Sequence, residues 1–142
     1  MAHRIRRLGP LGCLTVIALG CGAPGPSNAN LELNAAVLAE LPLPDGTDQI
    51  ARTDERHDVE GRYCADVTRL TLRAPSSDPV MVISSLEREL TPDGWRLQLG
   101  ETSGSGDPDL FVVSFEKGAA LVTVTNEGSD SGQYDLAVSH PC

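Results

Sequence analysis

The sequence predicts an α+β protein in which one main helix packs on an antiparallel sheet of four to five strands, a two-layer sandwich in the order β-α-β-β-β-β. Two observations predict it. Residues 79–90 repeat apolar side chains at helical spacing, whereas 63–73 and several segments after 95 are rich in β-branched residues or alternate apolar with polar ones. With 142 residues, 40% of them apolar, the chain suits one folded domain, which we place at 31–142.

The predicted main helix has well-defined ends. Asp78 suits the N-cap and Pro79 the first helical position. The turn sequence at 91–94, Thr-Pro-Asp-Gly, ends the helix. Its apolar face is formed by Val82, Ile83, Leu86 and Leu90.

The predicted strands surround this helix in sequence. Residues 63–73 form the first strand, which Pro75 ends, and Trp95 opens an alternating strand that runs to 99. After a loop rich in glycine and serine at 100–109, two strands form a hairpin around the turn Glu116-Lys117-Gly118. The hairpin strands are 110–115 and 119–125, and the last strand is 134–138.

The segment before the first strand is harder to interpret. Residues 33–40 favour a short helix, followed by a proline-rich turn at 41–46. Residues 48–61 are polar and charged, with Ile50 and Val59 as the only large apolar residues, which indicates an irregular loop or a short edge strand.

The first twenty residues are typical of a secretory signal peptide. Arg4, Arg6 and Arg7 form a positive start, and residues 8–19 form an apolar stretch of about twelve residues. A membrane-spanning helix needs about 20 apolar residues. We therefore assign 1–20 to a signal peptide that is removed after export.

The end of this stretch, Ala18-Leu19-Gly20-Cys21, resembles the lipobox of bacterial lipoproteins. The resemblance implies that Cys21 receives diacylglycerol and fatty acyl chains such as palmitate, and that the protein is anchored to the extracytoplasmic face of the cell membrane. Residues 21–30, rich in glycine, proline and asparagine, would then form a flexible tether. The alternative is ordinary signal-peptidase cleavage, which would release a secreted protein with a free thiol at Cys21.

The remaining cysteines predict one disulfide. After export the chain holds Cys21, Cys64 and Cys142, an odd number in an oxidising compartment, and lipidation of Cys21 leaves an even pair. Cys64 lies at the start of the first predicted strand and Cys142 follows the last. If these strands are antiparallel neighbours, their ends meet and the two cysteines pair.

The sequence predicts no catalytic residues and no cofactor. It has no Gly-x-Ser-x-Gly elbow and no phosphate-binding loop, and His3, His57 and His140 have no partner at metal-ligand spacing. A cluster of carboxylates could hold a divalent cation weakly, although a solvated charged loop is the favoured interpretation. These candidate metal ligands are Asp54, Glu55, Asp58 and Glu60.

The aromatic residues are expected in the core rather than in a ligand site. Trp95 is the only tryptophan and follows a glycine turn beside apolar alternation. Tyr63 and Tyr134 are interpreted in the same way.

The helix, the Gly94-Trp95 turn and the following strands resemble small single-helix domains of uncharacterised lipoproteins from GC-rich bacteria. The resemblance covers residues 43–142. It implies a fold and no assigned activity.

The net charge of −9 argues against nucleic-acid binding and against electrostatic adhesion to anionic lipids. We therefore expect a non-catalytic envelope lipoprotein that contacts another envelope protein or acts as a sensor, with the membrane reached through its lipid. Two alternatives remain: a small-ligand or cation-binding module that uses residues 54–60, and an envelope hydrolase.

Overall fold

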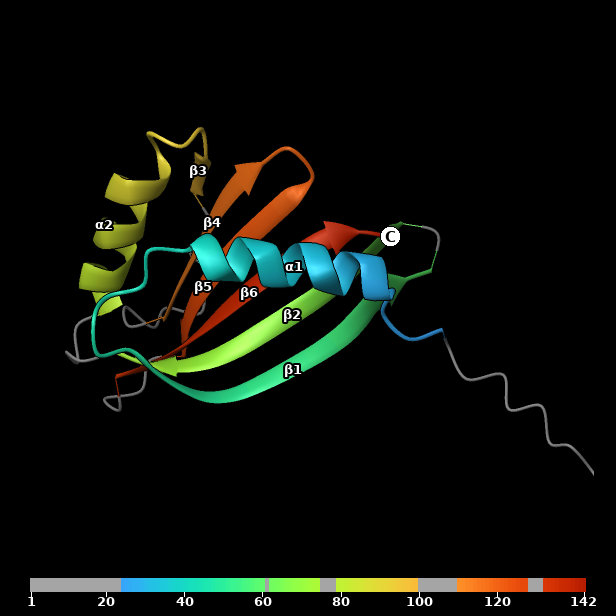
Figure 1. Cartoon of the computed structure of the whole chain (residues 1–142), viewed down its shortest axis with the longest axis horizontal. Coiled ribbons are helices and arrows are strands. Elements are labelled where there is room, and N and C mark those ends of the chain that lie inside the picture. The colour runs from blue at the N-terminus through green and yellow to red at the C-terminus, as the bar shows by residue number, and fades with distance from the viewer. Residues whose placement is uncertain (1–23, 61, 75–78, 100–109, 128–131) are drawn as a thin grey trace, which may run out of the picture.

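The computed structural model describes residues 24–60, 62–74, 79–99, 110–127 and 132–142 (Figure 1). The expected signal peptide, Cys21, Asp78 and the loop at 100–109 lie outside the described residues. The elements are α1 (Asn28–Glu40), β1 (Asp48–Val59), β2 (Tyr63–Arg73), α2 (Pro79–Leu90), β3 (Arg96–Leu99), β4 (Leu110–Lys117), β5 (Ala120–Glu127) and β6 (Gln133–Pro141).

The described strands form one antiparallel sheet in the order β1-β2-β6-β5-β4-β3. The strands β1 and β2 are a hairpin, and β3 to β6 run back and forth until β6 pairs with β2. The α+β class, the antiparallel sheet, the helix at 79–90 and the strands after it are confirmed. Six strands of the sheet lie within the described residues, one more than the upper limit of the prediction.

The additional strand is β1, which the sequence did not resolve. Instead of an irregular loop or a short edge strand, residues 48–59 form a strand of 12 residues at the edge of the sheet, paired along its length with β2. Its side chains are exposed or only half-buried on both faces. Because neither face enters the core, the strand carries no apolar alternation that could reveal it.

Helix α1 is longer than predicted and begins earlier. It covers 28–40 instead of 33–40, so its first residues come from the segment expected to be a tether. The start is fixed by Ser27, whose Oγ accepts a hydrogen bond from the Asn30 backbone N–H at 3.2 Å. The described part of the domain therefore has two helices of similar length rather than one main helix.

The core lies between α2 and the sheet. Val82, Leu86 and Leu90 of α2 are at most 2% exposed and join one apolar cluster with Phe115 and Leu136 of the sheet. Trp95 is 9% exposed in the same cluster, which confirms its predicted place in the core. Burial of each large side chain of this kind contributes about 1.5–3 kcal/mol relative to exposure.

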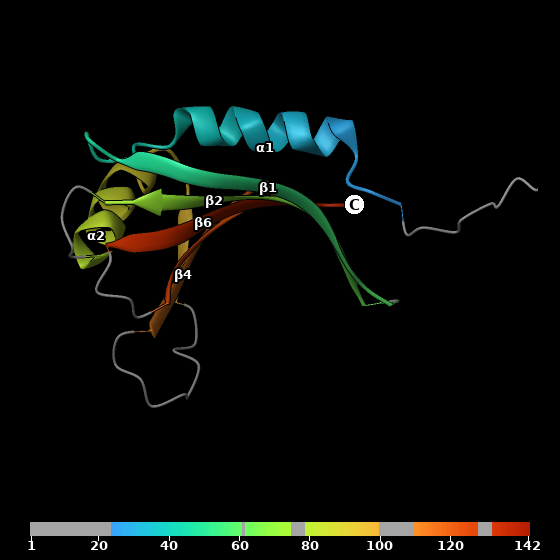
Figure 2. The same ribbon diagram turned by 90° about the horizontal axis from the view of Figure 1, so that it is seen from below.

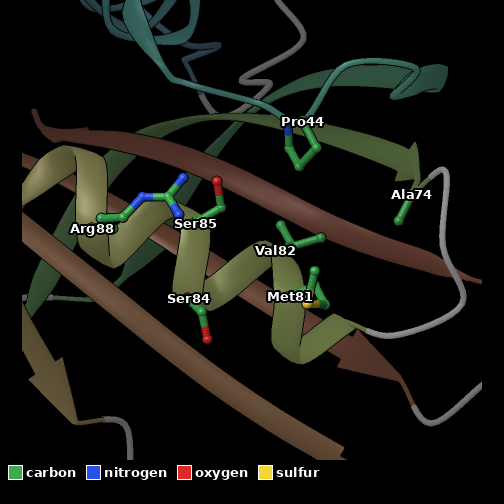
Figure 3. Close-up of a pocket in the computed structure, with 7 residues that line it drawn as sticks. All are labelled: Pro44, Ala74, Met81, Val82, Ser84, Ser85 and Arg88. Atoms are coloured by element: carbon green, nitrogen blue, oxygen red, sulfur yellow. The ribbon is translucent and has the colours of Figure 1, made fainter.

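A cavity of about 450 Å³ lies beside the core, where α2 faces the turn after α1 (Figure 3). Pro44 and Ala74 line it opposite Met81 and Val82 of α2. The turn is held by Thr47, whose Oγ1 donates to the Pro44 carbonyl oxygen at 2.7 Å. Gly46 allows the turn with a φ of 83°.

The predicted disulfide joins β2 to the residue after β6. Cys64 and Cys142 are bonded, their Cα atoms are 5.4 Å apart, and the Cys142 backbone N–H donates to the Cys64 carbonyl oxygen. The bridge closes a loop with a sequence separation of 78 residues. In the chain-entropy account such a loop stabilises the fold by about 4 kcal/mol.

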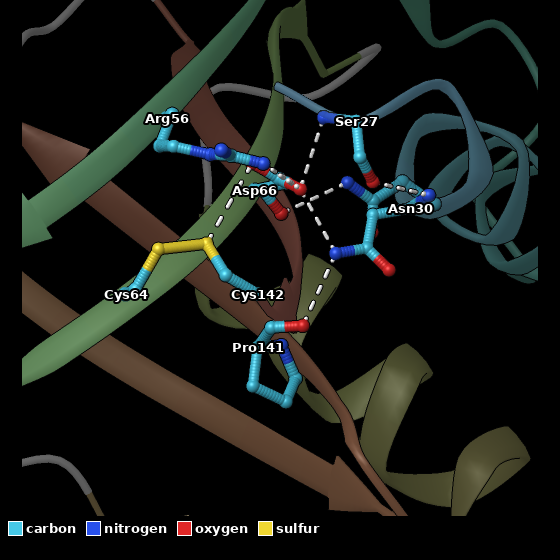
Figure 4. The surroundings of a disulfide bond; sticks show 8 residues. Ser27, Asn30, Arg56, Cys64, Asp66, Pro141 and Cys142 are labelled. Atoms are coloured by element: carbon cyan, nitrogen blue, oxygen red, sulfur yellow. Dashed lines mark hydrogen bonds and ion pairs between the residues drawn. A yellow bond between two sulfur atoms is a disulfide. The ribbon is translucent and has the colours of Figure 1, made fainter. Parts of the chain in front are cut away.

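Beside the disulfide, Asp66 of β2 is a buried charge with several partners (Figure 4). The residue is 0% exposed. Arg56 of β1 donates to both of its oxygens, from Nε at 2.7 Å and from Nη2 at 3.0 Å. The Ser27 backbone N–H and the Asn30 amide donate to Oδ2 at 3.1 and 2.9 Å. One carboxylate of β2 thus holds α1 and the edge strand β1 together.

These bonds favour the ionised carboxylate. The Arg56 hydrogen bonds lower the pKa of Asp66 most, and those from Asn30 and Ser27 lower it further, against the opposing effect of burial. The same pairing raises the pKa of Arg56. Both groups are therefore charged at neutral pH.

One turn further along α1, Asn34 makes a second buried polar contact with the sheet. Asn34 is 0% exposed, and its Nδ2 donates to the Asp66 carbonyl oxygen at 3.1 Å and to Thr68 Oγ1 at 3.3 Å. Its Oδ1 lies 2.7 Å from Nδ1 of His140, which must donate because Oδ1 can only accept. Burial lowers the pKa of His140, so the imidazole is neutral here.

We predict that Asp66→Asn lowers the free energy of unfolding at pH 7 by about 3 kcal/mol, because the change leaves Arg56 without its anionic partner. The folded pKa of Asp66 lies below its ordinary value of 3.8. Its stabilising effect is therefore complete well above pH 4. The effect declines as the pH falls below 4 toward the pKa of the folded state. Urea unfolding of both proteins at pH 7 and pH 3, with the disulfide intact, measures the difference.

The matched control is Asp93→Asn, an exposed aspartate after α2, which should leave stability unchanged at both values of pH. A difference between wild type and Asp66→Asn that stays the same from pH 7 to pH 3 would contradict the assignment of a stabilising ionised carboxylate.

Candidate functional site

One face of the sheet is covered by helices and the other is not. Side chains alternate between the faces of a strand, so in β2 the buried Thr68, Leu70 and Leu72 face the helices, and Val67 and Arg69 face the opposite side. Figure 2 shows α1 on one side of the sheet, and the buried residues of α2 pack against Leu70 and Leu72 on that same side. We call the opposite side the helix-free face.

Two hollows lie on the helix-free face. One, of about 260 Å³, is bordered by His57 and Arg69 on one side and by Thr123 and Ala137 on the other. The second, of about 270 Å³, extends toward Gln98 and Glu116 at the opposite edge of the sheet. Both are also lined by Tyr63, Leu121 and Ser139, so they form one continuous surface.

Tyr63 stands where the two hollows meet, which corrects its predicted place in the core. It is 53% exposed, whereas Tyr134, predicted in the same way, is 3% exposed and buried as expected. Tyr63 is the first residue of β2, on the face that no described helix covers. The alternation of side chains along β2 could have indicated this position, because it places Tyr63 on the same face as the charged Arg69.

A network of charged side chains lies beside the first hollow. Glu55 of β1 contacts Nε2 of His57 at 2.7 Å and Nη2 of Arg69 at 3.4 Å. Arg69 reaches Asp135 of β6 at 3.9 Å, and Asp135 accepts a hydrogen bond from Thr71 at 2.8 Å. The network thus spans three strands.

The hydrogen bond from His57 lowers the pKa of Glu55, with a smaller effect from Arg69 and an opposing effect of burial. The side chains of Glu55, His57 and Arg69 are 36–46% exposed. Exposed ion pairs of this kind contribute little to stability. They remain accessible to a binding partner.

The structure does not assemble the predicted metal ligands. Asp54 and Glu55 are successive strand residues and therefore point to opposite faces. Asp54 accepts a hydrogen bond from Thr68 and pairs with Arg52, while Glu55 pairs with His57 and Arg69. Asp58 and Glu60 are exposed at the end of the hairpin. Among the described residues, no three acidic, histidine or cysteine side chains form a group that could hold a metal ion.

No protein-family model matches this sequence, and neither a curated protein nor a solved structure shows significant similarity to it. Within the described ranges, neither helix is long and apolar enough to cross a membrane.

Proposed function

We propose that the protein is a non-catalytic binding module of the bacterial envelope, tethered to the membrane by a lipid on Cys21, which contacts another envelope protein through its helix-free face. The observation that carries the proposal is Tyr63, an exposed aromatic residue between two hollows on a face that no described helix covers. Tyrosine is enriched at the centres of protein interfaces, where its ring is buried and its hydroxyl hydrogen-bonds.

The surroundings of Tyr63 favour a protein partner over a small molecule. The hollows measure about 260 and 270 Å³, below the 300–1,000 Å³ typical of sites that enclose small ligands. Around the tyrosine lie hydroxyl groups, including Thr123 and Ser139, and the Glu55–Arg69 ion pair. An aromatic centre with a polar border is typical of protein interfaces.

The anchor and the domain are compatible in space. The start of α1 and the C-terminus lie at the same end of the domain, and α2 lies at the other (Figures 1 and 2). Residues 22–27 would reach about 20 Å when extended. A lipid on Cys21 would therefore hold this end close to the membrane, and the helix-free face would be presented sideways to proteins in or near the same membrane.

The disulfide supports an extracytoplasmic location. Disulfides persist in oxidising compartments and are rare in the cytosol. The Cys64–Cys142 pair leaves Cys21 for lipidation. The net charge of −9 makes direct contact with anionic headgroups unfavourable, so the lipid would supply the attachment.

We predict that Cys21→Ala moves the protein from the membrane fraction to the soluble fraction, because the chain then lacks the thiol that would carry the lipid. Fractionation of the native host, followed by intact-mass measurement, checks this, and the wild-type mass should include the acyl chains. Cys13→Ala is the control, since it changes a cysteine within the expected signal peptide and leaves the mature protein unaltered. Membrane retention of the Cys21→Ala protein would refute the anchor.

We predict that Tyr63→Ala weakens partner binding by at least about tenfold, the loss expected for a central interface residue. A photo-crosslinking amino acid would be introduced on the helix-free face in the native host. The amount of protein crosslinked to its partner would then be measured by immunoblotting. The control is Leu33→Ala on α1, which removes a side chain of similar exposure, 51%, from the opposite side of the sheet. Crosslinking that is insensitive to Tyr63→Ala, or reduced equally by both changes, would argue against this face.

A further inference from the structure

The cavity beside α2 differs in kind from the hollows on the helix-free face. Its volume of about 450 Å³ lies within the range of small-molecule sites. It lies at the end of the domain away from the start of α1, with α2 as one wall (Figures 1 and 3).

Most of the lining of this cavity is apolar. Val82 and Ala74, 2% and 9% exposed, form the part that adjoins the core. Pro44 lies opposite on the turn after α1. Met81 is 63% exposed, and its flexible thioether side chain can adapt to ligands of different shape.

The polar part of the lining includes one cation. Ser85 and Arg88 are one turn apart on α2, and both project on the side of Pro44 (Figure 3). The Nε of Arg88 donates to Glu89 at 3.0 Å, a bond in which the two Nη groups take no part. The guanidinium is therefore positioned to donate to an anionic group at the edge of the cavity.

We propose that this cavity binds a small monoanionic amphiphile, with its apolar chain against Val82, Ala74 and Pro44 and its carboxylate beside Arg88. Arg88, rather than the overall charge of the protein, favours this orientation. The chain carries a net charge of −9, which repels anions in general, so the carboxylate is stabilised only where a cation lies next to the apolar lining. A cationic head would find no acceptor on Arg88, because a guanidinium carries only donors.

The test is calorimetric titration of the whole exported chain carrying Cys21→Ala, which has no acyl group of its own to compete. The probe is decanoate below its micelle-forming concentration, compared with decyltrimethylammonium, which has the same chain length and the opposite charge. We expect one decanoate per protein and at least tenfold weaker binding of the cation. Arg88→Gln should weaken decanoate binding by at least tenfold.

Arg96→Gln is the matched control. Arg96 is 77% exposed and pairs with Glu116, as Arg88 is 74% exposed and pairs with Glu89, but Arg96 lies outside the cavity. Ser85→Trp should fill the cavity and abolish binding, and a melting curve would verify that this variant folds. If it does not fold, the comparison of the two arginine variants decides.

Three results would overturn the proposal: no binding of decanoate, equal effects of Arg88→Gln and Arg96→Gln, or undiminished affinity in a folded Ser85→Trp protein. Each would show that the cavity and its cation do not form the site.

Discussion

The buried carboxylate of Asp66 is the constraint on which the rest of the structure depends. A charge removed from water costs several kcal/mol unless it is paired and fully hydrogen-bonded. At 0% exposure Asp66 therefore needs Arg56 from β1 and the groups of α1 that donate to it. Asn30 also donates to the Pro141 carbonyl oxygen, which links the end of β6 to the same cluster. One side chain thus makes the placement of a helix and of two strands mutually dependent.

This arrangement separates the contacts that hold the fold from the proposed partner surface. The disulfide and the Asp66 cluster close the end of the domain where the proposed tether begins, and the apolar core under α2 holds the other end. The ion pairs of the helix-free face contribute little to stability, because they are half-exposed. Side chains such as Tyr63 can therefore serve recognition without a cost to folding, which is why the proposed partner surface lies there.

Sequence patterns predicted the elements that bury apolar side chains and missed those that do not. The helical spacing of Val82, Leu86 and Leu90 revealed α2, and the ends of the first and last predicted strands identified the disulfide. The first turn of α1 contains Asn28 and Asn30, a residue type that in a sequence is typical of turns, so only residues 33–40 were predicted as helix. Strand β1 has no buried face, and the exposure of Tyr63 depends on which side of the sheet the helices occupy. The burial of polar side chains and the choice of which sheet face the helices cover depend on tertiary packing. Neither can be predicted from the periodicity of apolar residues.

The most direct test of this account is hydrogen exchange of the α1 amides in wild type and in Asn34→Leu. Leucine is apolar and of similar size, but it leaves Thr68, His140 and the Asp66 carbonyl without the bonds that Asn34 makes. If buried polar contacts hold α1 on the sheet, its amides should lose protection at least about tenfold, while the amides of β2 and β6 remain protected. Protection of α1 equal to that of wild type would contradict the account, because apolar packing alone would then hold the helix in place.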